Sequence, residues 1–241
     1  MARRKSTAER KKQRKKVEEA AKKKARTKKV SKEAKAEKLV KKIDFGFKLF
    51  NKWDTNVIVE DPGLAPYIDL TPRIIPRSAG IHQKKRFHKS KMHIVERLAL
   101  HLLCTGHTGK RHRVTSGRFG GAFAQALSRV EKAMDIIEQK EKKNPIEVIV
   151  RAIENAAVHE EVTSYQIGSI MARSAVVTSP QRRIDKALRY MAQGAYKGAF
   201  RKNTTLEQAL AKEILGAYHN EKECMAIREK ERIEGEAAGA R

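Results

Sequence analysis

Outside residues 1–42, basic side chains gather in three parts of the sequence, and clusters of this kind bind the phosphates of nucleic acids. Residues 84–91 interleave lysine and arginine with one aromatic residue, Phe87. Residues 110–118 place cations in a glycine-punctuated stretch, and residues 182–183 and 201–202 lie at the two ends of an expected helix. The residues that we expect to contact phosphate are Arg77, Lys84, Lys85, Arg86, Lys89, Lys91, Lys110, Arg111, Arg113, Arg118, Arg182, Arg183, Arg201 and Lys202.

Arg182 and Arg183 are the strongest candidates in this set. They fall in the first turn of a helix that Ser179 and Pro180 introduce, where the helix dipole disfavours positive charge. Two cations in this place cost stability unless an anion lies nearby. We interpret them as phosphate ligands, and a solvated helix face is the alternative.

One group of residues has the ligand types of a zinc site. His101 and Cys104 are three residues apart and would share a helix face, and His107 could return from the following loop, with His112 nearby. The paired Cys-x-x-Cys motifs of zinc knuckles are absent, however, and Cys104 ends an apolar stripe. We therefore prefer a buried cysteine with histidines that face phosphate, and we assign no metal site.

Motifs of enzymes and of cofactor-binding proteins are absent from the sequence. It contains no phosphate-binding glycine loop, no His-Glu-x-x-His and no Gly-x-Ser-x-Gly. We therefore expect a protein that is not an enzyme and has no catalytic residue, metal or cofactor.

The segments that position the basic clusters have mostly helical periodicity. Apolar side chains recur every three or four residues in several stretches, and Asn-Pro, Ser-Pro and Thr-x-x-Gln signals mark three of their starts. Ser90 and Gly106 would begin and end the first helix. Helices are expected in residues 94–103, 119–137, 145–153, 180–195, 206–217 and 220–234. The fold class is therefore mainly α, a bundle of about six helices.

Residues 160–178 break the helical pattern. β-branched and aromatic residues flank Gly168-Ser169, and a glycine in the first of two turn positions suits a type II′ turn. This pattern predicts one β-hairpin in an otherwise helical protein. A lone two-stranded ribbon is marginally stable in water, so it must lean on helices or on a partner. Its small tip predicts that it protrudes.

The sequence divides into a basic N-terminal extension, residues 1–42, and a single helical domain, residues 43–241. The extension holds 20 Lys and Arg against 5 Glu and no aromatic residue, which predicts a segment that is disordered when free. Residues 43–78 contain four prolines and are expected to wrap irregularly over the core, with residues 57–59 as a possible edge strand. Trp53 is expected to pack in that core, and stacking on a base is the alternative.

The composition of the whole chain excludes several classes of protein. Its 241 residues carry a formal net charge of +26, which favours a polyanionic partner. Two cysteines cannot form a disulfide framework and indicate a reducing compartment. No apolar run is long enough to span a membrane, and the N-terminus resembles no secretory signal. We therefore expect a cytoplasmic protein with no membrane partner.

Several stretches resemble the ribosomal protein S-seven family, the universal small-subunit family, in its archaeal and eukaryotic branch. Residues 144–155 are similar to the family's signature helix, and residues 179–188 are similar to its second signature. Further stretches that fit are residues 48–53, 61–64, 78–87 and 94–98. The resemblance covers about residues 45–234, and the archaeal type fits best.

The resemblance implies a structural, rRNA-binding protein of the small ribosomal subunit that acts in translation. Such a protein binds the 3′ major domain of the rRNA and nucleates assembly of the head. Its hairpin would lie near the E-site tRNA and the mRNA exit path, beside ribosomal protein S-eleven and other head proteins. The hairpin residues placed there are Ile167, Gly168, Ser169, Met171 and Arg173. A basic helical protein that compacts DNA is the alternative reading of the sequence.

The sequence also departs from the family pattern. Val158-His159 stands where relatives have Pro-Arg, and Arg173 is the one cation in the hairpin arms. The loop of residues 107–117 is longer than its counterparts. These departures concern the electrostatics of the hairpin and the contacts of the loop, and they leave the resemblance of the helices intact.

Overall fold

A computed structural model describes residues 46–106 and 122–241 of the chain. The chain divides into two units, Met1–Gly46 and Phe47–Arg241, and every helix and strand of the described residues belongs to the second unit. The extension predicted for residues 1–42 lies outside the described residues. The helices of this part of the chain are α2 (Ile94–Leu102), α3 (Phe123–Glu141), α4 (Pro145–Ala156), α5 (Pro180–Ala199), α6 (Leu206–Tyr218) and α7 (Met225–Ala238).

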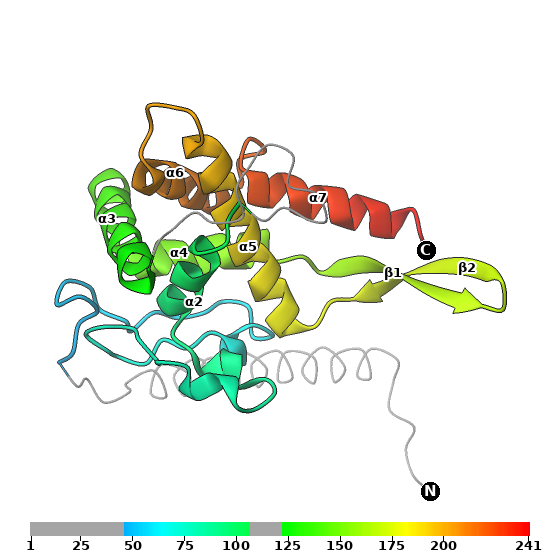
Figure 1. Cartoon of the computed structure of the whole chain (residues 1–241), viewed down its shortest axis with the longest axis horizontal. Helices are drawn as coiled ribbons and strands as arrows, with labels where there is room; N and C mark the ends of the chain where they lie inside the picture. The colour runs from blue at the N-terminus through cyan, green and yellow to red at the C-terminus, as the bar shows by residue number, and fades with distance from the viewer. Residues whose placement is uncertain (1–45, 107–121) are drawn as a thin grey trace, which may run out of the picture. The chain divides into compact units, whose positions relative to one another are not determined.

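The predicted fold class is confirmed, because six helices and one antiparallel hairpin make up the described elements (Figure 1). Three short 3-10 helices precede them, η1 (Ala65–Tyr67), η2 (Ile81–Gln83) and η3 (His88–Lys91). None of the helices in residues 46–106 and 122–241 is long and apolar enough to cross a bilayer.

Local capping chemistry accounts for the starts of two helices. At the start of α4, the side chain of Asn144 accepts a hydrogen bond from the backbone N–H of Ile146 at 3.0 Å, and a proline occupies the first turn. At the start of α6, Thr205 and Gln208 form the reciprocal capping box that their spacing predicts. Both starts are therefore confirmed.

The start of α2 differs from the prediction. His93 rather than Ser90 is its cap, and the imidazole Nδ1 accepts a hydrogen bond from the N–H of Val95. Burial, with a smaller effect from Arg73, lowers the pKa of His93 to about 4. The ring therefore stays neutral and can accept the bond. The Ser90 hydroxyl instead donates to a backbone carbonyl of the preceding turn. The second helix begins at residue 123, and residue 119 lies outside the described residues.

The core joins all six helices. α6 packs against α3, α4 and α5, while α2 packs against α3 and α5 (Figure 1). α4 is buried on most of its surface, because Val148 and Ala152 are buried in addition to the predicted apolar face. A helix that is apolar on most sides is typical of the centre of a core. α7 contributes Ala226 and Ile227, and it begins later than the residue-220 start that we expected.

Residues 46–78 lack α-helix but reach deep into this core. Leu49, Trp53, Leu64 and Ile68 are buried in the same apolar cluster as the helices. The Trp53 ring lies in the protein as expected, and its Nε1–H donates to the Glu138 carboxylate at 2.9 Å. Trp53 is therefore a packing residue, and its ring is not available to stack on a base.

Residues 57–59 do not form the edge strand that we considered possible. They pair with no strand among the described residues, and the Ile58 side chain is exposed. The backbone that follows has another partner, since the N–H groups of Glu60 and Asp61 both donate to one oxygen of Glu154, at 2.7 and 3.0 Å. A carboxylate on α4 thus holds this segment in place of a strand ladder.

The predicted hairpin is present and protrudes from the helices (Figure 1). Its strands, β1 (Glu160–Ile167) and β2 (Ile170–Val177), pair in register from Glu160–Val177 to Ile167–Ile170. Gly168 has a φ of +60°, and Ser169 has a negative φ, as a type II′ turn requires. The residues near the tip, including Ile167, Ile170 and Met171, are exposed.

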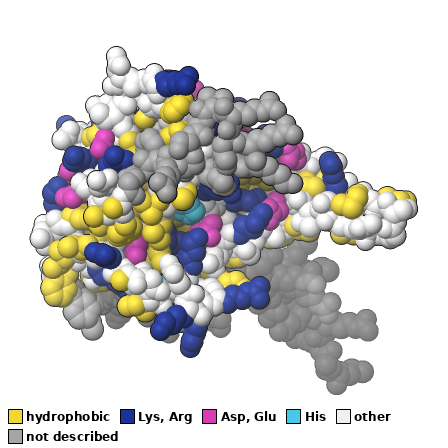
Figure 2. Space-filling view, viewed as in Figure 1, with side chains coloured by type: hydrophobic (Ala, Val, Ile, Leu, Met, Phe, Trp, Pro, Cys, Tyr) yellow, Lys and Arg dark blue, Asp and Glu magenta, His cyan; other side chains and the backbone are white. Residues whose placement is uncertain are grey.

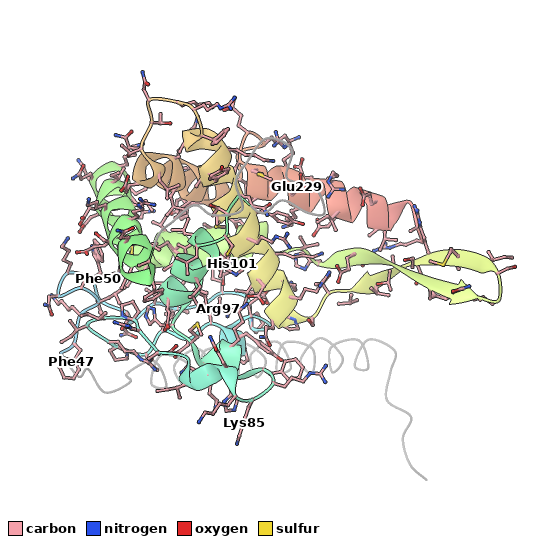
Figure 3. All side chains as sticks on the ribbon, viewed as in Figure 1. Phe47, Phe50, Lys85, Arg97, His101 and Glu229 are labelled. Carbon is pink, nitrogen blue, oxygen red and sulfur yellow. The ribbon has the colours of Figure 1, made fainter. Side chains whose placement is uncertain are left out.

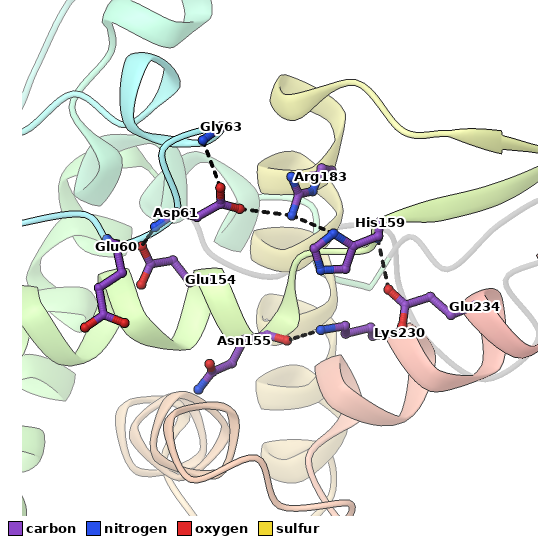
Figure 4. A network of polar contacts seen from close by, with 9 residues as sticks. All are labelled: Glu60, Asp61, Gly63, Glu154, Asn155, His159, Arg183, Lys230 and Glu234. Carbon is purple, nitrogen blue, oxygen red and sulfur yellow. Dashed lines mark hydrogen bonds and ion pairs between the residues drawn. The ribbon is translucent and has the colours of Figure 1, made fainter. Parts of the chain in front are cut away.

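Polar contacts from α7 hold the base of the hairpin (Figure 4). The backbone N–H of His159 donates to Glu234 on α7 at 3.0 Å, and Lys230 on α7 donates to the carbonyl of Asn155 at 2.8 Å. Arg241 pairs with Glu160 at the first residue of β1. α7 therefore stabilises the hairpin at its root and leaves the distal half unsupported.

A buried ion pair connects α2 with α5. Arg97 on α2 is 0% exposed, and its guanidinium donates to Asp185 on α5 and to the carbonyl of Tyr67, each at 2.9 Å. Lys89 binds the same Asp185 oxygen at 2.9 Å, and His101 lies 3.7 Å from it. Burial acts to raise the pKa of Asp185, but His101, Lys89 and Arg97 hold it well below its usual range.

Replacement of Arg97 by methionine should lower the free energy of unfolding by about 3 kcal/mol, because it breaks a buried pair and leaves Asp185 undercompensated. Lys89→Met is the matched control, since it removes a more exposed cation from the same carboxylate and should cost about 1 kcal/mol or less. Urea unfolding followed by circular dichroism measures both losses. Equal losses would contradict the central role of Arg97.

Candidate nucleic-acid interface

Two of the predicted basic clusters meet in one open groove, which we call the basic groove. Its cations are Arg86 and Lys89 from the segment around η3 and Arg182, Lys186 and Arg189 from α5. The groove has a volume of about 670 Å³. Figure 2 shows Lys and Arg side chains gathered on the face that carries α2, α5 and the segment below them. The two clusters are about 100 residues apart in the sequence, so the fold alone brings them together.

The cations of α5 follow a helical spacing. Arg182, Lys186 and Arg189 stand at positions i, i+4 and i+7, which lie on one face of a helix. We did not assign Lys186 or Arg189 from the sequence, although their spacing from Arg182 was a usable signal. Arg183 is one position out of this series and therefore points elsewhere.

One carboxylate orients two cations of the basic groove. Glu161 on β1 binds the Arg182 guanidinium through Nε at 2.7 Å and through Nη2 at 2.9 Å, and it binds Lys186 at 2.6 Å. Burial acts to raise the pKa of Glu161, but Arg182 and Lys186 lower it, so the carboxylate stays ionised. Arg182 nevertheless remains 58% exposed. Its position is fixed while part of its donor fork faces solvent.

Other cations at this edge have no carboxylate beside them. Arg86 and Arg189 form no ion pair with any of the described residues, and both are exposed. Lys84, Lys85 and Lys91 are exposed next to the groove, and Lys85 points away from the helices (Figure 3). Burial lowers the pKa of His88, and the positive charges of Lys91 and Lys85 lower it further. The local potential is therefore positive.

The groove also contains planar side chains. The Phe87 ring and the Tyr190 ring both line it, and the Arg86 guanidinium lies 5.1 Å from the centroid of Phe87. Burial raises the pKa of Tyr190, so its hydroxyl is protonated at neutral pH. Cations beside exposed aromatic faces are the surface that binds phosphates and unstacked bases.

Arg183 has a different environment from Arg182. Its side chain is 11% exposed, and its Nη2 lies 3.1 Å from both Asp61 and the Nδ1 of His159 (Figure 4). The anion that we inferred from the helix dipole is therefore present, but it is a carboxylate of this chain. The dipole argument gives no support for phosphate at Arg183, and contact with phosphate there remains untested.

Several predicted residues do not belong to the basic groove. Arg77 is exposed outside its lining, and Arg201 and Lys202 follow the far end of α5, a helix that spans about 30 Å. The Arg201 guanidinium lies over the Phe200 ring at 5.2 Å, and Lys202 lines a separate groove beside α6. The residues of the middle cluster, Lys110, Arg111, Arg113 and Arg118, lie outside the described residues.

Two of the four residues of the possible zinc site, His101 and Cys104, lie in the part of the chain that is described. Cys104 is exposed, so its interpretation as a core cysteine was wrong, and it is Cys224 that is buried. No group of three His, Cys, Asp or Glu side chains within residues 46–106 and 122–241 could hold a metal. His107 and His112 lie outside these residues. His101 instead lies beside Asp185.

Replacement of Arg183 by glutamine should lower the free energy of unfolding by about 2 kcal/mol or more, because Asp61 would lose its partner in a mostly buried place. The matched variant is Arg182→Gln, which should cost at most about 1 kcal/mol, since the Arg182 side chain is mainly exposed. Thermal and urea unfolding measure the difference. A larger loss for Arg182→Gln would refute the assignment of Arg183 to an internal role.

Comparison with known proteins identifies the family of the chain. The family model for ribosomal protein S7p/S5e matches residues 67–241. The chain is 47% identical over 195 residues to the small ribosomal subunit protein uS7 of Nanoarchaeum equitans, covering 80% of this chain and 98% of that protein. It is 41% identical over 197 residues to uS7 of Methanococcus vannielii, covering 80% of this chain and 95% of the relative. The chain that carries the basic groove therefore belongs to the S7p/S5e family of ribosomal proteins.

Proposed function

We propose that this protein binds the rRNA of the small ribosomal subunit and that the basic groove is a primary contact. The observation that carries the proposal is the convergence of five cations from two distant segments on one surface. Among the described residues, Asp185 is the one carboxylate that lines this groove, and Arg97, Lys89 and His101 surround it. Glu161 beside the groove pairs with Arg182 and Lys186, so the two carboxylates are outnumbered by the five cations. The surface therefore presents a net positive charge to a phosphate backbone.

The finer assignment rests on the family. Its members named above are small-subunit ribosomal proteins. We infer that the RNA is the 3′ major domain of the small-subunit rRNA and that binding nucleates assembly of the head. The exposed cations Lys84, Lys85 and Lys91 would extend the contact beyond the groove. This role needs no catalytic residue or cofactor, and it places the protein in the cytoplasmic ribosome.

The hairpin has a separate role in this proposal. Its tip carries Ile167, Gly168, Ser169 and Met171, all exposed, and Arg173 pairs across the ladder with Ser164. We place this tip near the E-site tRNA and the mRNA exit path, beside ribosomal protein S-eleven. The support is its projection from the helices together with the scarcity of charge, which suits a contact other than the main rRNA anchor.

Binding should depend on salt in the way that phosphate contacts require. The logarithm of the affinity should fall with the logarithm of the salt concentration by about 0.7–0.9 per neutralised phosphate, and Arg189→Gln should reduce the total slope by about 1. Lys222→Gln, which removes one positive charge outside the groove, should leave the slope unaltered. Filter binding with a head-domain rRNA fragment and with a random duplex of equal length measures both.

The fragment should remain preferred over the duplex at raised salt. If the protein bound both equally at every salt concentration, a generic basic binder such as a DNA-compacting protein would be the better interpretation.

Removal of the distal hairpin tests its separate role. The register pairs Tyr165 with Ala172, so deletion of residues 165–172 leaves Ser164 opposite Arg173, where a two-residue turn can close the shortened ribbon. Folding and rRNA affinity should be preserved, because the deleted residues contribute nothing to the core cluster or the groove. Retention of E-site tRNA in reconstituted subunits should change. A tenfold loss of rRNA affinity would instead make the hairpin a primary anchor.

A further inference from the structure

Phe87 combines a strained backbone with an exposed ring. Its backbone has a φ of +65°, in the left-handed region that costs free energy for every residue except glycine and is a clear outlier for a bulky side chain. Its side chain is also 60% exposed, so burial of the ring does not offset this cost. A strained and exposed aromatic residue is a reason to look for a ligand of its ring.

Hydrogen bonds hold Phe87 in this conformation. Its carbonyl accepts from the N–H of Ser90 at 3.2 Å and from the Ser90 hydroxyl at 2.8 Å. On the other side, the N–H of His88 donates to the carbonyl of Lys85 at 3.3 Å. The ring is therefore presented to solvent by a defined turn rather than by a loose loop.

The surroundings of the ring select one class of ligand. The Arg86 guanidinium lies over the ring, and the same groove contains Arg182, Lys186 and Arg189. A purely apolar partner would leave Arg86 and Arg189, which form no ion pair with the described residues, without counter-charges. A fully paired duplex would offer phosphates but no free planar face. An unpaired nucleotide supplies both a base that stacks on an aromatic ring and phosphates that bind the cations.

We propose that the basic groove recognises an unpaired nucleotide of the rRNA, whose base stacks on Phe87 while the flanking phosphates bind the cations of α5. This inference rests on the proposed rRNA-binding function and adds to it the kind of RNA element that the groove reads. Tyr190 lines the same groove and would bound the position of the base. The specificity for a loop or bulge would therefore come from the Phe87 ring, and the salt dependence of binding would come from the cations of α5.

Three substitutions in the full chain separate stacking from structure. Phe87→Tyr keeps the planar ring, Phe87→Leu keeps an apolar side chain without a planar face, and Phe87→Gly removes the ring and relieves the left-handed strain. Phe47→Leu is the control, because Phe47 is 52% exposed and lies outside the groove. The two RNA probes are the head-domain rRNA fragment, with its loops and bulges, and a perfect duplex of equal length.

The expected result is specific to the fragment. Phe87→Leu and Phe87→Gly should weaken fragment binding at least fivefold, about 1 kcal/mol, and duplex binding less than twofold. Phe87→Tyr and Phe47→Leu should stay within twofold of the original protein. The salt slope should not change in any of them, because no phosphate contact is removed. The Tm of Phe87→Gly should equal the original value or exceed it by up to about 3 °C.

The results that overturn the inference differ from those that overturn the proposed function. Fragment binding by Phe87→Leu and Phe87→Gly within twofold of the original protein would eliminate stacking and leave a protein partner as the ligand of the ring. Equal losses for fragment and duplex would also eliminate it. In both cases the effect of Arg189→Gln on the salt slope would still support rRNA binding. If the original protein shows no preference for the fragment, the proposed function and this inference fail together.

Discussion

Arg97 on α2 has no exposed surface, so the protein itself must supply the partners of its charge. Asp185 on α5 and the carbonyl of Tyr67 supply them, and together they fix the first turns of α5 against α2 and η1. Lys89 binds the same Asp185 oxygen from the η3 segment. The two walls of the basic groove therefore meet at one carboxylate, and the placement of Arg182, Lys186 and Arg189 depends on it.

Charged and polar side chains also hold the root of the hairpin. Glu154 holds the backbone of residues 60–61, and Asp61 in turn binds Arg183 on α5 (Figure 4). From the other side α7 holds the backbone of residues 155 and 159. A single mispaired charge in this region would leave a partner desolvated, which is why buried networks of this kind impose one arrangement.

Local features of this fold could be predicted from the sequence, and long-range pairings could not. The cap at Asn144, the capping box of Thr205 and the turn at Gly168 follow from chemistry within a few residues. The partner of Arg183 lies 122 positions away, and no periodicity reveals such a pairing. The edge strand considered at residues 57–59 failed for the same reason, since a distant carboxylate holds the adjoining backbone. Arg189 could have been assigned to the groove from the sequence, because it stands seven residues after Arg182 and therefore shares its helix face.

The contrast between Arg182 and Arg183 shows that the sequence alone does not tell which of two adjacent arginines is free to bind RNA. Both stand in the first turn of α5, and both have a carboxylate within hydrogen-bond distance. Glu161 takes Nε and Nη2 of Arg182 and leaves the rest of a five-donor guanidinium on an exposed side chain, so a phosphate can bind without displacing it. Arg183 is largely enclosed between Asp61 and His159. A carboxylate of the same chain can therefore either orient an arginine toward RNA or occupy it inside the protein. The exposure of the arginine side chain decides which of the two occurs.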